Sequence, residues 1–315
     1  MKGDARDLRV LVLTGPTASG KTEVAVQLAE AVGGEIVSAD SMQVYRYLDI
    51  GTAKPSSDLR ARVPHHLLDV VSPDEPYHAA RFMEEADRAI RAIAERGRVP
   101  VVCGGTALYL KVLLWGLAPA PGRDAEVRKE LEARWDAGER GALWEELRRV
   151  DPERAARLHP HDRTRIIRAL EVWRTTGRPL SAFHRAHRFE GRRYQALCMA
   201  LLVDRRELRR RINERTVRMV DAGWVDEVRR VLAMGYGAHL PPLRAIGYRE
   251  ICAHVLEGMP LGEAVRHIQR ETRRFAKRQM TWFRRMELAW FPPHRLADMV
   301  SEAKKFLQSK ALSLR

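Results

Sequence analysis

The sequence is poor in cysteine and has no long apolar run. Its three cysteines, Cys103, Cys198 and Cys252, are far apart and form no C-x-x-C pair. This spacing argues against a zinc site and against a disulfide framework, so we expect a cytoplasmic protein. No apolar stretch approaches the ~18–20 residues of a membrane-spanning helix, and no membrane partner is expected. The charged N-terminus leads directly into an apolar segment, unlike a secretory signal.

Negative charge is also scarce. The chain has 56 lysines and arginines against 41 aspartates and glutamates, a net charge of +15. Residues 198–315 hold 24 of the basic and 13 of the acidic residues, a net +11. Such an excess favours a polyanionic partner, with nucleic acid first and an anionic membrane surface second. The alternative is a solvated, arginine-rich surface.

One short stretch has the pattern of a phosphate-binding loop. An apolar run at 10–14 leads into G-P-T-A-S-G-K-T, which fits G-x-x-x-x-G-K-[ST] at every fixed position, and a helical pattern follows at 23–32. In a strand–loop–helix context the loop N–H groups and the helix N-terminus bind phosphate. Lys21 would reach the terminal phosphate, and the Thr22 hydroxyl would hold Mg²⁺. The predicted phosphate-binding residues are Gly15, Pro16, Thr17, Ala18, Ser19, Gly20, Lys21 and Thr22.

Strand and helix patterns alternate in the first 115 residues. Strands are predicted at 35–38 and 99–103 and helices at 79–96 and 107–115, with mostly loop at 49–78. This alternation predicts an α/β fold with a parallel sheet flanked by helices. Asp40 follows the second strand, so it should lie at the sheet edge that carries the phosphate loop.

The pattern changes after Pro119, Pro121 and Gly122. Residues 126–176 show helical periodicity without strand signals, and 178–193 look basic and loop-like. A strand is predicted at 195–203, helices at 205–233 and 244–285, a short strand at 287–291 and a last helix. We therefore predict a P-loop core at 1–118 and 198–315 and an all-helical insertion at 119–197.

A phosphate loop leaves the chemistry open. ATPases, GTPases and kinases need a second Mg²⁺-holding carboxylate after an apolar strand. The strand ending at Cys103 is followed by Gly104-Gly105-Thr106, and Asp204 and Asp69 are weak candidates for that carboxylate. The other hypothesis is that the loop holds the diphosphate of a substrate, whose departure is the reaction.

Seven segments carry a family resemblance. They are G-P-T-A-S-G-K-T at 15–22, D-S-M-Q at 40–43, D-I-G-T-A-K at 49–54, P-H-H-L-L-D at 64–69, G-G-T at 104–106, I-G-Y-R at 246–249 and K-R-Q-M-T-W at 277–282. Together they resemble the bacterial-type tRNA dimethylallyltransferases (tRNA isopentenyltransferases, the IPP transferase family). The resemblance spans about residues 8–292 and is weaker at 119–197.

The resemblance implies a P-loop NTPase-like sheet with a helical insertion. It also implies a reaction: the dimethylallyl group of dimethylallyl diphosphate moves to N6 of adenosine 37, beside the tRNA anticodon, diphosphate leaves, and Mg²⁺ is needed. The expected partners are the tRNA anticodon stem-loop and dimethylallyl diphosphate, and the expected state is a monomer. The rival hypotheses are an adenylate isopentenyltransferase, a P-loop kinase or ATPase, and a non-catalytic RNA-binding protein.

Three residues are predicted to be catalytic. An exocyclic adenine amine is a poor nucleophile, so a carboxylate that accepts its proton would help, and Asp40 is suitably placed. Its alternative role is that of a turn or cap residue. Thr106 resembles the family residue that meets the target nucleotide or orients Asp40, and it could also cap a helix. Lys21 is the third predicted catalytic residue. Arg215 matches the arginine with which the family contacts the diphosphate, and a planar guanidinium can donate two parallel hydrogen bonds to such a group.

The predicted tRNA-binding residues fall into three groups. Asp40, Ser41, Met42, Gln43 and Thr106 would read anticodon-loop bases. In the insertion, Thr164, Arg165 and Arg168 match a family segment that contacts tRNA, with Ile166 and Ile167 packing inward, and Arg128 is a further candidate. Near the C-terminus cations alternate with aromatic residues, at Arg244, Gly247, Tyr248, Arg249, Lys277, Arg278, Gln279, Trp282 and Arg284. The alternative for Trp282 and the neighbouring Phe283 is core packing at the end of an amphipathic helix.

Overall fold

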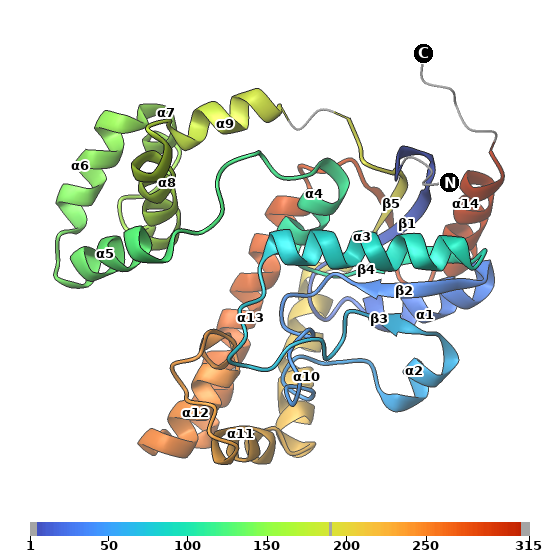
Figure 1. Cartoon of the computed structure of the whole chain (residues 1–315). Coiled ribbons are helices and arrows are strands. Elements are labelled where there is room, and N and C mark those ends of the chain that lie inside the picture. The colour runs from blue at the N-terminus through green and yellow to red at the C-terminus, as the bar shows by residue number, and fades with distance from the viewer. Residues whose placement is uncertain (1–4, 189–190, 310–315) are drawn as a thin grey trace. The chain divides into compact units, whose positions relative to one another are not determined.

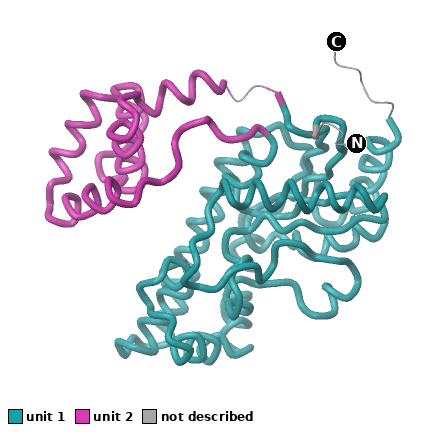
Figure 2. Tube along the Cα trace, in the orientation of Figure 1, with its two compact units in different colours: residues 1–114, 192–315 teal, residues 115–191 magenta. Residues whose placement is uncertain are grey.

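The computed structural model describes residues 5–188 and 191–309 (Figure 1). The chain forms two compact units, one of residues 1–114 and 192–315 and one of residues 115–191 (Figure 2). Both domain boundaries, expected after residues 118 and 197, lie a few residues earlier in the structure. The second is wrong because the strand that returns the chain to the sheet begins at Gln195, so residues 192–197 belong to the core.

The first unit contains one six-stranded parallel sheet in the order β3-β2-β4-β1-β5-β6. Its strands are β1 (Arg9–Thr14), β2 (Gly34–Ser38), β3 (His65–His66), β4 (Val99–Cys103), β5 (Gln195–Leu201) and β6 (Ala289–Phe291). In the central strand Leu11 pairs with Val101 on one side and with Leu197 on the other. The predicted α/β class is confirmed, and every strand ends at the same edge because all pairs are parallel.

Helices surround this sheet and extend from it. They are α1 (Lys21–Val32), α2 (Ser57–Arg62), α3 (Ala79–Glu95), α4 (Ala107–Trp115), α10 (Arg205–Asp221), α11 (Trp224–Ala233), α12 (Tyr248–Glu257), α13 (Leu261–Phe283) and α14 (Leu296–Gln308), with short 3₁₀ turns at Ala5–Asp7 and Pro241–Arg244. The region 49–78, expected to be mostly loop, contains α2 and β3. The region 244–285 is two helices, because Gly258 ends α12 in a left-handed conformation (φ +74°).

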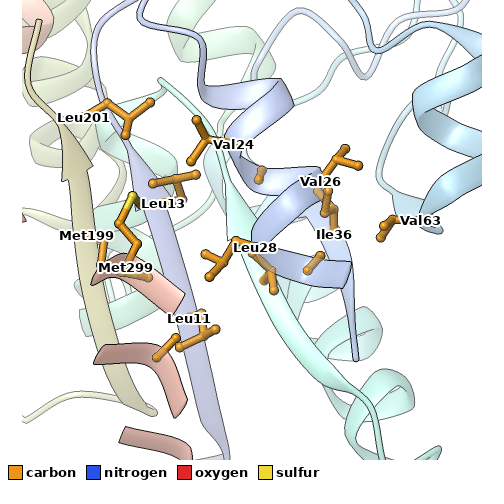
Figure 3. Close-up of a cluster of buried hydrophobic side chains, with 14 residues drawn as sticks. Leu11, Leu13, Val24, Val26, Leu28, Ile36, Val63, Met199, Leu201 and Met299 are labelled. Atoms are coloured by element: carbon orange, nitrogen blue, oxygen red, sulfur yellow. The ribbon is translucent and has the colours of Figure 1, made fainter. Parts of the chain in front are cut away.

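The sheet core follows the alternation of strand side chains. Leu11 and Leu13 of β1 face α1 and α14 and meet Leu28 and Met299 (Figure 3). The two helices contact each other on that face (Figure 1), and α3 packs on β2 and β4. Val10 and Val12 alternate with these leucines and are also fully buried. A strand buried on both faces explains why β1 reads as a continuous apolar run.

A second apolar cluster of the same unit joins the segment after β2 to the C-terminal helices. Val44 and Leu48 pack with Trp224 of α11, Tyr248 of α12 and Ile268 of α13. These side chains are nearly or fully buried. The cluster therefore fixes the segment that follows Asp40 against helices that lie about 180 residues further along the chain.

The second unit is helical, as the sequence predicted. Its helices are α5 (Ala125–Asp136), α6 (Arg140–Val150), α7 (Pro152–Ala155), α8 (Arg163–Thr176) and α9 (Leu180–His187). Ile166 and Ile167 lie in its core, which confirms their inward packing. The loop expected at 178–193 was wrong in part, because Leu180 and Phe183 bury one face of α9 in that core. In the described parts of both units, no helix has the length and apolarity needed to span a membrane.

Candidate active site

The carboxyl ends of three neighbouring strands are joined by backbone hydrogen bonds. Ala39 N–H donates to the Cys103 carbonyl (2.8 Å), and Gly104 N–H donates to that of Leu13 (3.2 Å). The Thr14 hydroxyl also donates to the Gly104 carbonyl (2.8 Å). A Cβ on Gly104 would lie 2.1 Å from the Ala39 carbonyl oxygen, so the close approach requires glycine there. This explains why a G-G-T sequence, and no carboxylate, follows β4.

A cavity of about 1060 Å³ opens at this edge of the sheet. Its walls come from the phosphate loop, the Asp40 turn, the Gly104–Thr106 loop, α10 and α13. Thr17, Ala18, Gly20, Lys21 and Thr22 line it, and so do Asp40, Ser41, Met42, Gln43 and Thr106. The structure therefore brings the predicted catalytic residues and most of the predicted phosphate-binding residues to one cavity, as expected for the carboxyl edge of an open sheet. Gly15, Pro16 and Ser19 are buried behind it and do not line it.

The phosphate loop has the curled backbone that such loops need. Ala18 and Gly20 have positive φ angles of 62° and 90°, and Lys21 is the first residue of α1. Its ammonium donates to the Pro16 carbonyl (2.9 Å). Burial lowers the pKa of Lys21 to about 8, although the charges of Cys103 and Asp40 act in the opposite direction. The lysine is thus desolvated and held ready for an anion.

Arg215 of α10 reaches the same loop. Its guanidinium donates to the Thr17 hydroxyl (2.6 Å), and burial lowers its pKa. One helical turn away, Arg211 is paired with Glu207 (2.7 Å). Arg218 also lines the cavity from α10 and was missed by the sequence prediction. Its spacing of three residues from Arg215 placed it on the same helix face and was the available signal.

Asp40 has the turn role that was the alternative to catalysis, but only through one oxygen. Its Oδ1 accepts from the N–H groups of Met42 (2.9 Å) and Gln43 (3.4 Å). Thr106 Oγ1 accepts from Ser41 N–H (3.0 Å) and donates to the Ser41 hydroxyl (3.3 Å). Thr106 therefore fixes the turn that orients the Asp40 carboxylate. The two predicted roles of Asp40 are compatible.

Gln279 has a different task from the predicted contact with tRNA. Its side chain is 6% exposed. Its carbonyl oxygen accepts from Thr17 N–H (2.8 Å), and its amide nitrogen donates to the Gly105 carbonyl (2.8 Å). Both ends of the side chain are therefore used within the protein, where they tie the phosphate loop to the loop after β4.

Replacing Gln279 by alanine is expected to loosen the phosphate loop. The change leaves the half-buried Thr17 N–H and the buried Gly105 carbonyl without their partner, which costs about 2 kcal/mol of unfolding free energy. Inorganic diphosphate should bind about tenfold more weakly by calorimetry, one tenfold step being about 1.4 kcal/mol. Gln308→Ala, at an exposed position of α14, is the control. Unchanged diphosphate affinity would contradict the assigned task.

The other predicted RNA-contacting residues of the first unit are mostly exposed. Lys277, Arg278, Trp282 and Arg284 are exposed on α13 or directly after it. Arg244, at the end of the 3₁₀ turn before α12, and Arg249, on α12, are also exposed. Trp282 is 46% exposed, so the core-packing alternative is wrong for it, whereas Phe283 is fully buried. Gly247 and Tyr248 are buried. Tyr248 lines the cavity but donates its hydroxyl within the protein, to Glu227 (2.7 Å).

In the second unit two predicted arginines hold a buried carboxylate. Glu171 is fully buried and pairs with Arg128 (3.3 Å) and Arg168 (3.2 Å). A buried carboxylate needs such partners, so both guanidiniums have a structural role that the sequence reading did not foresee. Thr164 and Arg165 are exposed, and Arg165 Nε donates to Asp162 (2.6 Å).

The two weak candidates for a second Mg²⁺-holding carboxylate lie elsewhere in the first unit. Asp204 caps α10 by accepting from Arg206 N–H (2.7 Å). Asp69 pairs with Lys54 (2.5 Å). Neither lines the cavity, whereas Asp40 does. The arrangement therefore departs from the one that nucleotide hydrolysis requires.

The fold and the cavity define a P-loop α/β protein in which the phosphate-loop pattern and a carboxylate, Asp40, line one cavity. The chain belongs to the IPP transferase family: the model of that family matches residues 43–286, and the model described as isopentenyl transferase matches residues 8–63. These two matches cover the phosphate loop, the Asp40 turn and the C-terminal helices.

Relatives and solved structures agree with this membership. The chain is 54% identical to a tRNA dimethylallyltransferase of Geobacter sulfurreducens, over 88% of this chain and 89% of the relative. It is 51% identical to tRNA dimethylallyltransferase 1 of Citrifermentans bemidjiense, over 98% and 100%. A tRNA isopentenylpyrophosphate transferase structure from Bacillus halodurans is 36% identical, covers 95% of this chain and 97% of its own, and has a TM-score of 0.71. A eukaryotic dimethylallyltransferase acting on tRNA (24% identity, 98% and 82% covered, TM-score 0.83) shares the fold.

Proposed function

We propose that this protein is a tRNA dimethylallyltransferase. It transfers the dimethylallyl group of dimethylallyl diphosphate to N6 of adenosine 37, next to the anticodon, and releases diphosphate. The observation that carries this proposal is the position of Asp40, whose carboxylate lines the same cavity as Lys21 and Thr22 of the phosphate loop. A general base that close to a phosphate cradle suits an acceptor attacking the carbon that carries the leaving diphosphate.

In the proposed step one C–N bond forms and one C–O bond breaks. The adenine amine attacks the first carbon of the dimethylallyl group, its proton passes to the free oxygen of Asp40, and the C–O electrons leave with the diphosphate. The loop N–H groups, Lys21 and Arg215 stabilise the charge that develops on the leaving oxygens. Because Arg215 and Lys21 are both desolvated by burial, they attract that charge strongly.

The residues of the cavity fit a magnesium ion held together with the diphosphate. Thr22 lines the cavity directly after Lys21, and its hydroxyl is an oxygen ligand of the kind that Mg²⁺ prefers. Mg²⁺ normally takes few protein ligands and completes its shell with phosphate oxygens and water. When bound, the ion would supply positive charge to the diphosphate.

The acceptor side favours RNA over a free nucleotide. Arg278 lines the cavity from α13, and Lys277, Trp282 and Arg284 are exposed on or directly after the same helix. Such cations and aromatic faces bind the backbone and the bases of single-stranded loops. The target adenine would leave its stack to enter the cavity. An adenylate isopentenyltransferase would have no use for this exposed surface.

One incubation separates the hypotheses. The protein is mixed with Mg²⁺, labelled dimethylallyl diphosphate and either tRNA with adenosine 37 or AMP, and ATP hydrolysis is followed in parallel. We expect label in tRNA, none in AMP and no ATP turnover. Label in AMP alone would identify an adenylate isopentenyltransferase. Label in neither acceptor, with ATP hydrolysed, would overturn the proposal in favour of a kinase or ATPase.

The binding of the diphosphate substrate should depend on pH through Lys21. Its pKa of about 8 means that most of the ammonium is charged below pH 8 and has lost its proton above it. Because diphosphate binds the charged form, its affinity should be nearly constant below about pH 7, fall about fivefold from pH 8 to pH 9, and fall about tenfold per pH unit above that. Measuring the KM for dimethylallyl diphosphate from pH 6 to 9.5 checks this. Lys21→Met should abolish the slope, and a slope that survives in that variant would assign the titration to another group.

A further inference from the structure

Glu227 of α11 is a buried carboxylate that the proposed reaction does not use. It is 2% exposed. Its Oε2 accepts from the N–H groups of Asp49 (2.8 Å) and Ile50 (2.6 Å), and its Oε1 accepts from Gly51 N–H (3.1 Å). The Tyr248 hydroxyl donates the fourth hydrogen bond that the carboxylate accepts, also at Oε1 (2.7 Å). Three consecutive backbone amides and one hydroxyl satisfy a charge whose burial would otherwise be very unfavourable.

Tyr248 is well suited to donate a hydrogen bond to Glu227. Burial and the neighbouring Glu227 charge raise the pKa of the Tyr248 hydroxyl well above its ordinary value. The hydroxyl therefore stays protonated and donates its hydrogen bond to Glu227. The hydrogen bonds of Glu227 therefore link α11 to α12, through Tyr248, and to the loop at residues 49–54.

The loop at residues 49–54 is hydrogen-bonded to the turn that begins at Asp40. The Gln43 amide nitrogen donates to the carbonyls of Thr52 (3.3 Å) and Ala53 (3.1 Å). Gln43 N–H donates to Asp40 Oδ1, so the side chain and the backbone of one residue connect the loop to the carboxylate. Hydrogen bonds, joined by short stretches of backbone, thus connect Glu227 to the loop, the loop to Gln43, and Gln43 to Asp40.

Trp224, one helical turn before Glu227 on α11, fixes the same loop by packing. A Cβ on Gly51 would lie 2.2 Å from the Trp224 indole nitrogen. A Cβ on Gly247, whose φ is +96°, would lie 2.2 Å from Cη2 of the same ring. The indole therefore fits only between two glycines. It prevents the loop at 49–54 from moving toward α11, while Glu227 prevents it from moving away.

We infer that Glu227 is a positioning residue for the transfer reaction: it fixes the loop at 49–54 and, through Gln43, the direction in which Asp40 presents its free oxygen to the acceptor amine. This inference rests on the proposed function. Misplacing a catalytic group by about 1 Å costs about a hundredfold in rate. The phosphate loop and Lys21 are held by other contacts, so binding of the diphosphate does not depend on Glu227.

The test is a double-mutant cycle. Glu227→Gln keeps the size of the side chain but turns an amide donor toward backbone N–H groups. We expect kcat with an anticodon stem-loop RNA to fall about thirtyfold, while the KM for dimethylallyl diphosphate stays within about twofold. If Glu227 acts through Asp40, the Glu227→Gln/Asp40→Ala variant will be no slower than Asp40→Ala alone. Losses that multiply would overturn the inference.

Two further measurements keep the test decisive. Amide hydrogen exchange at Asp49–Gly51 should be faster in Glu227→Gln, and exchange at wild-type rates would also overturn the inference.

Tyr248→Phe removes a single donor and is the milder variant should Glu227→Gln not fold. Its kcat should fall about fivefold, and this loss should vanish in the Asp40→Ala background. The matched control is Asp226→Asn on the same helix, whose carboxylate forms a surface pair with Arg229 and should leave activity unchanged. A wild-type chain that transfers nothing would defeat the proposed function, whereas active wild type with multiplicative losses defeats only this inference.

Discussion

Asp40→Ala is expected to lower the rate of dimethylallyl transfer about a thousandfold, within the range for loss of a general base. The adenine amine would then attack without a group to accept its proton. Affinity for tRNA should change less than about threefold, because the exposed cations and aromatics of α13 are unaffected. Single-turnover transfer with labelled substrate and filter binding of tRNA measure the two quantities separately.

The variants of Asp40 also separate chemistry from structure. Asp40→Asn retains an oxygen for the N–H groups of Met42 and Gln43 but offers no base. It should be nearly as slow as the alanine variant and should melt at the temperature of the wild type. Asp74→Asn, at an exposed loop position, is the control. A normal transfer rate together with a collapse of tRNA affinity would make Asp40 a recognition residue.

Lys21→Met is expected to lower kcat/KM for dimethylallyl diphosphate about a hundredfold or more. The half-buried ammonium is a donor on the cavity wall where diphosphate charge would develop, and removing one such donor costs about 10²–10³ in rate. Inorganic diphosphate should lose affinity in parallel, and this loss is measurable without any acceptor. The size of methionine suits this half-buried position, so the fold should be retained.

The comparison with Arg215 refines this prediction. Arg215→Met should also weaken diphosphate binding, but it additionally leaves the Thr17 hydroxyl without its donor. Lys304→Met, on the exposed side of α14, controls for the loss of one positive charge. Wild-type diphosphate affinity in Lys21→Met would refute the role of the loop as a diphosphate cradle.

Local patterns in the sequence determined the parts of the fold that depend on short-range order. The strand at 10–14, the loop at 15–22 and the helix after it lie together in the chain, so their pattern predicted them directly. The same holds for Asp40 and Gly104–Thr106, because parallel strands end at one edge. Domain boundaries and α9 were misjudged, since they depend on which apolar side chains find a core.

Side-chain roles that depend on distant partners required the structure. Gln279 looked like an RNA contact, yet it bonds to Thr17 and Gly105, which lie 262 and 174 residues away. Glu227 carried no sequence signal, because its partners Asp49–Gly51 are some 177 residues distant. The sequence by itself determined which groups could bind a diphosphate and which could accept a proton. Only the tertiary structure decided which side chains hold those groups in place, because hydrogen bonds between distant segments exist only once the segments are packed together.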